Sequence, residues 1–171
     1  SLPGLPWLAR LHAAGNLTVA IVASEADRSR QGWLARIEQA AALGLGLDAP
    51  HPNAHDDVYD ALPALTAAIE TERLAHRLEI VAPDGRSLYL NRLDTQGAWV
   101  DPPRAAARLV EYRERPLDGP ALADAALRWI TLGVRLSANA TIPRALVART
   151  LAWGDDAAHR ARLDARAAQR L

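Results

Sequence analysis

Two short segments of alternating apolar and polar residues, at 77–82 and 86–91, constrain the fold of this chain more than any other feature. Pro83-Asp84-Gly85 lies between them, and each of these residue types favours a tight turn. Alternation on both sides of such a turn predicts a β-hairpin over 77–92. We expect one face of this hairpin to point toward the core and to carry Leu78, Ile80, Leu88 and Leu90.

A third strand is predicted at residues 17–23, Leu-Thr-Val-Ala-Ile-Val-Ala. This segment is apolar on both faces, which is typical of a strand in the middle of a sheet. Ser24 and Asp27 follow it with the spacing of a capping box. We therefore expect a helix to begin there and to continue to about Leu43.

The chain from Asp101 onward is predicted to be helical. Asp101, Asp118 and Thr141 each lie just before a proline, an arrangement that favours the start of a helix. A further helix, rich in alanine and arginine, is predicted from Asp155 to the end of the sequence. The helices before it should bury two apolar faces, Leu122, Ala126, Trp129, Gly133 and Leu136 in the first, and Leu146, Val147, Leu151 and Trp153 in the second.

These elements predict an α+β fold, in which a small sheet (strand 17–23 plus hairpin 77–92) is covered by helices and followed by an all-helical C-terminal half. The length fits a single globular domain over residues 1–171, with a candidate sub-boundary near 99–103. The sequence has no cysteine, which excludes disulfides and thiolate chemistry. No apolar run reaches the roughly 18 residues of a membrane span, so we expect a soluble protein.

The twenty basic residues are all arginine, and lysine, methionine and phenylalanine are absent. Codon usage in a GC-rich bacterial genome explains this composition, with selection against lysine as the alternative. We therefore expect a bacterial, cytoplasmic protein. The formal net charge is zero, but residues 101–171 hold twelve arginines and eight acids, so an acidic partner would contact this half.

The first candidate site comprises His51, His55, Asp56 and Asp57, with Asp60 close behind. Imidazole and carboxylate groups close in sequence are ligands for a divalent metal such as zinc or manganese, which would activate water in a hydrolase. Two prolines within residues 48–57 instead predict a polar loop, whose aspartates cap the helix that follows. Both interpretations stay open, and the polar loop is favoured.

The turn after the first strand is a candidate for anion binding. A strand, a turn and a helix in this order hold phosphate groups in nucleotide-binding proteins, and Ser24, Arg28 and Arg30 would supply the hydroxyl and the charge here. Glu25 and Asp27 would repel an anion, and the segment is not rich in glycine. A capped helix start explains the same residues.

A cluster of arginines on the last predicted helix, at positions 160, 162, 166 and 170, could face nucleic acid or an acidic partner. Three aspartates dilute this charge, and no aromatic side chain follows Trp153 to stack on a base. A solvated helix face is therefore favoured, and nucleic acid is not the expected partner.

No catalytic motif such as Gly-x-Ser-x-Gly occurs in the sequence. We therefore expect a non-catalytic protein–protein interaction protein, such as an adaptor, an accessory subunit or a chaperone. Its partner would be another protein or a second copy of the chain, with an acidic surface suiting helices of residues 101–171. The alternative is a small metal-dependent hydrolase that uses residues 51–60.

Overall fold

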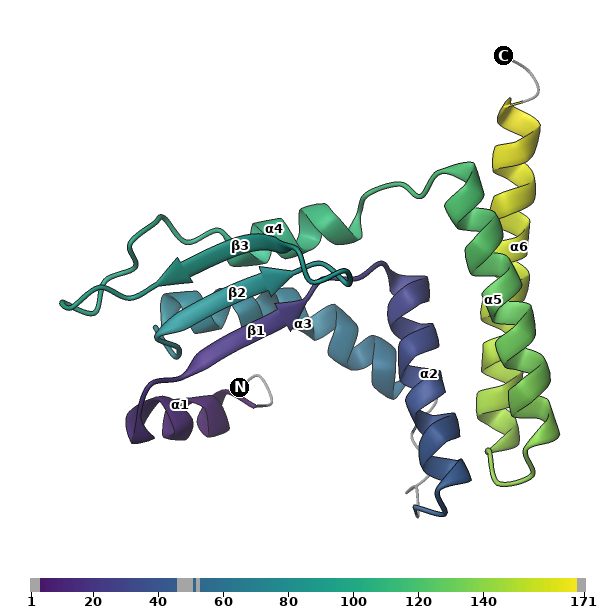
Figure 1. Ribbon diagram of the computed structural model, residues 1–171, viewed down its shortest axis with the longest axis horizontal. Coiled ribbons are helices and arrows are strands. Elements are labelled where there is room, and N and C mark those ends of the chain that lie inside the picture. Colours follow the sequence, from purple (N-terminus) through teal and green to yellow (C-terminus); the bar gives the residue numbers. More distant parts are fainter. Residues whose placement is uncertain (1–3, 46–50, 52, 169–171) are drawn as a thin grey trace. The chain divides into compact units, whose positions relative to one another are not determined.

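The computed structural model describes residues 4–45, 51 and 53–168, and it has the predicted α+β fold. The chain forms two compact units. The sheet unit comprises residues 1–25 and 58–115, and the helical unit comprises residues 26–57 and 116–171. The elements are α1 (Leu5–Ala14), β1 (Thr18–Val22), α2 (Ala26–Ala42), α3 (Ala54–Thr71), β2 (Arg77–Val81), β3 (Ser87–Arg92), α4 (Ala105–Arg113), α5 (Gly119–Ala138) and α6 (Arg144–Ala168) (Figure 1).

The three strands form one sheet in the order β1–β2–β3 (Figure 1). β1 runs parallel to β2, with Ile21 opposite Ile80, and β2 runs antiparallel to β3. β1 therefore lies at an edge, and the expectation of a central strand at 17–23 was wrong. Only one face of β1 packs into the core, because Ile21 is buried there whereas Val22 is exposed.

The predicted hairpin is confirmed, and it contains a β-bulge that the sequence did not indicate. Ile80 lies opposite Tyr89, whereas the next residue, Val81, lies opposite Ser87. The register therefore shifts between these two pairs, and Leu88 has no opposite residue of its own. Such an extra residue bends a strand and increases its local twist.

The bulge reverses the face that β3 turns toward the core. Leu78 and Ile80 are fully buried, as predicted. The residues opposite them are Asn91, which is buried, and Tyr89, which packs against the core. Leu88, at the bulge, packs against the core as predicted, whereas Leu90 is 46% exposed, so its predicted inward position was wrong. A slip of one residue moves every side chain of a strand to the opposite face.

A buried side chain at the end of α3 caps α4. The carboxylate of Glu70 accepts the backbone N–H groups of Arg104 and Ala105, and it also accepts a hydrogen bond from the Tyr89 hydroxyl. Arg104 occupies the N-cap position and makes no side-chain cap. The predicted capping role of Asp101 was therefore wrong, because a tertiary contact satisfies the first N–H groups of the helix.

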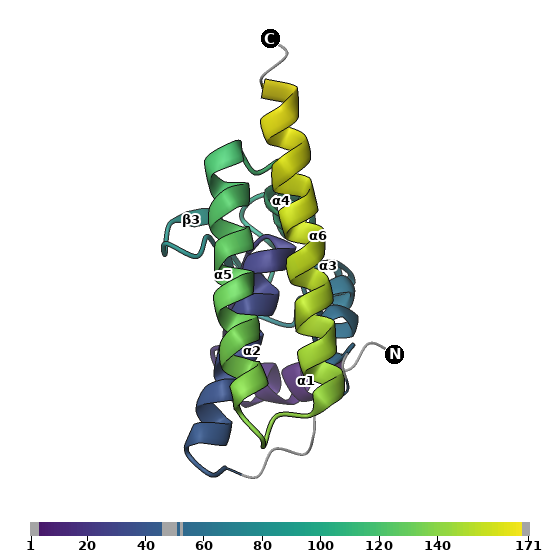
Figure 2. The same ribbon diagram turned by 90° about the vertical axis from the view of Figure 1, so that its right-hand side faces the viewer.

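The helical unit is built on α5 and α6, which lie side by side and run antiparallel (Figure 2). Trp129 of α5 and Trp153 of α6 are buried, with ring centres 5.5 Å apart. Leu34 of α2 packs into the same core. Asp118 caps α5 as predicted, since its side chain accepts the Ala121 N–H at 2.9 Å.

The predicted buried face of α5 is confirmed at Ala126, Trp129, Gly133 and Leu136. α6 differs from the prediction, because it is one continuous helix from 144 to 168 rather than two helices separated near Asp155. Leu146 and Trp153 are buried as predicted, whereas Leu151 is exposed, and Thr150 and Gly154 are also buried. Gly154 permits close packing, since a Cβ atom there would lie 3.3 Å from the Cβ atom of Trp129.

α3 begins at Ala54, earlier than the sequence indicated, so part of the predicted loop is helical. Asp56 and Asp57 lie in its first turn, where carboxylates interact favourably with the helix dipole. Pro63 lies inside the helix. None of the helices in the described residues is both long and apolar enough to cross a membrane.

Candidate functional site

The residues of the predicted metal site are only partly brought together. His55 and Asp56 are neighbours in the first turn of α3, and Nδ1 of His55 lies 2.9 Å from Oδ1 of Asp56. His51 precedes the helix, and its Nδ1 accepts the backbone N–H of Asn53 at 3.3 Å. Asp57 is exposed. Among residues 4–45, 51 and 53–168, no three His, Cys, Asp or Glu side chains are grouped to hold a metal ion.

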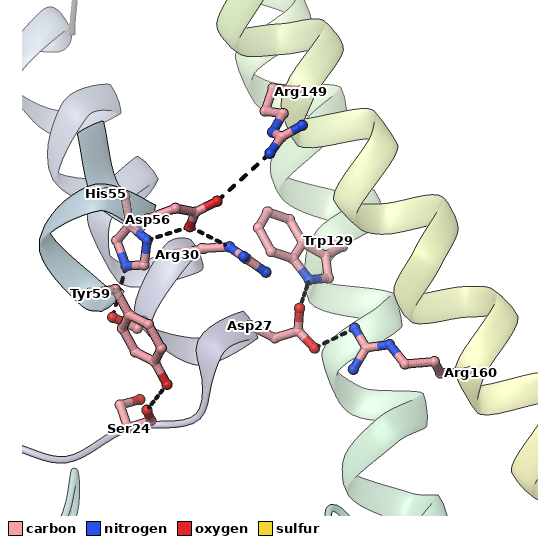
Figure 3. Close-up of polar contacts among 10 residues, drawn as sticks. Ser24, Asp27, Arg30, His55, Asp56, Tyr59, Trp129, Arg149 and Arg160 are labelled. Carbon is pink, nitrogen blue, oxygen red and sulfur yellow. Dashed lines mark hydrogen bonds and ion pairs between the residues drawn. The ribbon is translucent and has the colours of Figure 1, made fainter. Parts of the chain in front are cut away.

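Asp56 lies at the centre of a charged cluster in the helical unit (Figure 3). Its Oδ1 accepts a hydrogen bond from Nε of Arg30 at 2.8 Å, and its Oδ2 lies 3.7 Å from the guanidinium of Arg149. Burial raises the pKa of Asp56, but the hydrogen bonds from Arg30 and His55 outweigh burial and hold this pKa below its usual value. The carboxyl group is therefore ionised and can only accept hydrogen bonds. We call Ser29, Arg30, His55, Asp56 and Arg149 the Asp56 cluster.

The charge on Asp56 fixes the tautomer of His55. Because an ionised carboxylate cannot donate, Nδ1 of His55 carries the proton that lies between the two groups. In the neutral ring Nε2 is then an acceptor, and Oγ of Ser29 lies 2.9 Å from it. In this neutral form Ser29 donates to His55, and His55 donates to Asp56. The His55 side chain is only 8% exposed, and its ring centre lies 5.7 Å from that of Trp33.

Both arginines of the Asp56 cluster lie over the same aromatic ring. The guanidinium carbons of Arg30 and Arg149 are 5.0 and 5.2 Å from the ring centre of Trp153. A cation over an aromatic face contributes roughly 0.5–1 kcal/mol at an exposed position. The ring and the carboxylate together hold both positive charges beside Asp56.

The order Ser29–His55–Asp56 is that of a hydroxyl, a base and an orienting carboxylate. Both hydrogen bonds are 2.9 Å long, which is within reach for proton transfer. The same bonds oppose metal binding, because both ring nitrogens of His55 and Oδ1 of Asp56 are engaged. The roles of Ser29 and Arg149 were not predicted, because these residues come from α2 and α6 and no local sequence pattern links them to residues 51–60.

A second ionic contact in the helical unit involves the buried Asp27 (Figure 3). Its Oδ1 accepts from Nε1 of Trp129 at 3.2 Å, and its Oδ2 accepts from Arg160 at 2.7 Å. Arg160 also donates to Asp156. Burial lowers the pKa of Arg160, but the bonds and charges of the two aspartates outweigh it and raise this pKa overall. The carboxylate of Asp27 therefore faces α5 and α6, and the capping box predicted with Ser24 was wrong.

The residues of the predicted anion site have separate surroundings. Ser24 belongs to the sheet unit, where its carbonyl accepts a hydrogen bond from Tyr59. Arg30 is bonded to Asp56. Arg28 lines a groove of the helical unit instead. Of the arginines predicted to cluster on the last helix, Arg160 is paired with Asp27, positions 162 and 166 are exposed, and position 170 lies outside the described residues.

This groove, of about 530 Å³, lies between α2 and α5 within the helical unit. Its lining combines apolar and basic residues, namely Arg28, Ala35, Leu127, Arg128, Leu132 and Arg135 among others. Arg128 pairs with Asp124 at 2.7 Å, and Arg135 pairs with Glu38 at 2.9 Å. The groove is thus a mixed surface that carries both signs of charge along α5.

An exposed apolar stripe on α5 borders the groove. Leu127, Ile130 and Val134 are 63%, 56% and 66% exposed. Their i, i+3, i+7 spacing places them on one side of the helix, apart from the stripe that packs against α6. We call these three residues the α5 face. The spacing of these three residues is present in the sequence, but only the stripe that packs against α6 was predicted.

Comparisons with protein-family models, with curated proteins and with solved structures gave no match to this chain.

Proposed function

We propose that this chain is a protein–protein interaction protein, in the class of adaptors and accessory subunits, and that it docks through the α5 face. The observation that carries the proposal is the 56–66% exposure of three large apolar side chains on one side of a helix. Helix-in-groove and helix-on-helix docking use this spacing. Burial would stabilise a complex by about 1.5–3 kcal/mol for each such side chain, before the cost of association.

The charges beside the α5 face favour a second copy of the chain as the partner. Asp124 and Arg135 are eleven residues apart, which is about three helical turns, so they lie on the same flank of α5. If two copies pack α5 against α5 in antiparallel orientation, each Asp124 lies near Arg135 of the other copy. Such an arrangement buries both apolar stripes and pairs opposite charges at both ends.

Sedimentation equilibrium of the full chain over the micromolar range tests this proposal. We expect a monomer–dimer equilibrium that Ile130→Glu shifts toward the monomer. Leu163→Glu is the matched control, because Leu163 is 51% exposed on α6 and does not belong to the α5 face. Substitution at exposed positions changes stability by less than about 0.5 kcal/mol, and circular dichroism checks the fold. A monomer at every concentration, or a dimer that Ile130→Glu does not weaken, contradicts the proposal.

Charge exchange tests the antiparallel orientation. Asp124→Arg and Arg135→Glu each place like charges opposite one another, so each variant alone should associate more weakly than the native chain. A mixture of the two variants restores opposite charges at both ends and should form a mixed dimer. Since an exposed pair contributes roughly 0.2–1 kcal/mol, we expect the mixed dimer to be several-fold tighter than either variant alone. If the mixture associates no more tightly than each variant alone, the antiparallel orientation is excluded.

A further inference from the structure

We propose that Ser29 is an acyl-accepting nucleophile, with His55 as its base, that reacts with small activated carboxylic esters. This activity goes beyond the proposed interaction function and does not depend on the α5 face. The geometry of three groups on two helices carries it: Ser29 on α2, and His55 with Asp56 on α3.

The hydrogen bonds define the path of the proton. Oγ of Ser29 lies 2.9 Å from Nε2 of His55, and Nδ1 of His55 lies 2.9 Å from Oδ1 of Asp56. Arg30 donates to the same carboxylate oxygen at 2.8 Å and fixes its position. Asp56 therefore orients the ring, and Nε2 presents its lone pair to the hydroxyl of Ser29. In this scheme Asp56 is a positioning residue.

Exposure of the two reacting groups indicates the size of the substrate. Ser29 is partly exposed, whereas the side chain of His55 is 8% exposed. Part of Ser29 is therefore accessible to a molecule from solvent, whereas the base is shielded. A short acyl group fits such access better than a bulky one. The substrate class is accordingly an ester of a short-chain carboxylic acid with a good leaving group.

The reaction balances with water as the only co-reactant. Oγ of Ser29 forms a bond to the carbonyl carbon, and its proton moves to Nε2 of His55. The bond from that carbon to the leaving oxygen breaks, and the departing alcohol takes the proton from Nε2. Water then attacks the acyl-Ser29 ester in the same way, which releases the carboxylic acid and restores the hydroxyl.

Labelling with a fluorophosphonate, together with turnover of p-nitrophenyl acetate, tests this proposal. The fluorophosphonate forms a phosphorus–oxygen bond to serine with loss of fluoride, and mass spectrometry locates the adduct. We expect one adduct per chain, at Ser29, and no adduct or turnover in Ser29→Ala. Ser137→Ala is the matched control, because that hydroxyl donates to the Gly133 carbonyl at 2.7 Å, and it should change nothing.

The role of His55 needs a measurement that a merely structural role would not affect. His55→Ala should slow labelling by about 100-fold, and added imidazole should restore labelling in this variant but not in Ser29→Ala. If His55→Ala does not fold, Asp56→Asn provides the test, since an amide that donates to Nδ1 favours the tautomer with the proton on Nε2. No adduct in the native chain, an adduct elsewhere, or labelling that neither substitution slows overturns the proposal.

Discussion

Both carboxylate oxygens of Glu70 accept the backbone N–H of Ala105, at 3.1 Å for Oε1 and 3.0 Å for Oε2. Glu70 is buried near the end of α3, and Ala105 is the first residue of α4. A negative charge at the start of a helix interacts favourably with its dipole. This contact therefore joins two helices of the sheet unit through one side chain.

Removal of this carboxylate should destabilise the protein. Glu70→Ala leaves the buried N–H of Ala105 and the hydroxyl of Tyr89 without their acceptor, so we expect the free energy of unfolding to fall by about 3 kcal/mol. Urea denaturation measures the change. Glu72→Ala is the control, because Glu72 is exposed on the same segment and should matter by less than about 0.5 kcal/mol. Equal effects of the two substitutions would show that the contact does not stabilise the fold.

Substitution by alanine should change the stability of the protein in opposite directions at two glycines, one on α5 and one on α6. At Gly133 a Cβ atom would lie 2.9 Å from Cδ2 of Leu151, the flexible end of an exposed side chain that can move away. Gly133→Ala should therefore be neutral or stabilise the protein by up to about 1 kcal/mol through helix propensity. At Gly154 the neighbour is the Cβ atom of Trp129 at 3.3 Å, which is held by the backbone.

We expect Gly154→Ala to destabilise the protein by about 1–3 kcal/mol, because an added methyl group has to push apart two packed helices. Thermal unfolding of the two variants side by side measures both changes. A stabilising effect of Gly154→Ala would show that α5 and α6 are not packed as closely as this structure has them.

Asp56 should make stability depend on pH in acid. Its pKa is lowered in the folded chain, so its contribution is fully present above the unfolded pKa of about 4 and is lost as the pH falls through the lower folded value. Below about pH 4 the free energy of unfolding of the native chain should therefore fall more steeply than that of Asp56→Asn. Asp57→Asn removes the same charge at an exposed position and should keep the native slope. Coincident slopes for the native chain and Asp56→Asn would contradict the prediction.

Zinc or manganese should leave the thermal midpoint of the native chain unchanged. His55 and Asp56 are bonded to Ser29 and Arg30, and an ion would have to break these bonds before it could bind. Calorimetry with and without the metal, and elemental analysis of the purified protein, provide the measurement. Stabilisation by metal that disappears in His51→Ala/His55→Ala would contradict this prediction and favour the metal-dependent hydrolase.

The features that local chemistry determines could be predicted from the sequence. The turn at Pro83-Asp84-Gly85 and the alternation around it indicated the hairpin, and Asp118 indicated the start of α5. The features that distant pairing determines could not. The edge position of β1 depends on which side of β2 the hairpin partner occupies, and the reversed face of β3 depends on one unpaired residue, Leu88.

In the candidate sites too, local features could be predicted and contacts between distant residues could not. His55 and Asp56 are adjacent in sequence and were predicted to act together. Their partners Ser29 and Arg149 come from α2 and α6, and only the packing of the helical unit brings them there. The helix cap provided by Glu70 has the same origin, because its acceptor and donor are 35 residues apart.

Along the sequence, segments of the sheet unit alternate with segments of the helical unit. This order determines when each unit can fold during synthesis. α2 leaves the ribosome well before α5 and α6 have been synthesised, although Leu34 and Ile37 pack against those helices in the finished molecule. Because synthesis proceeds at roughly 5–20 residues per second, α5 and α6 are made several seconds after α2. The sheet unit ends at residue 115 and can fold during this interval, so it can close before the helical unit does.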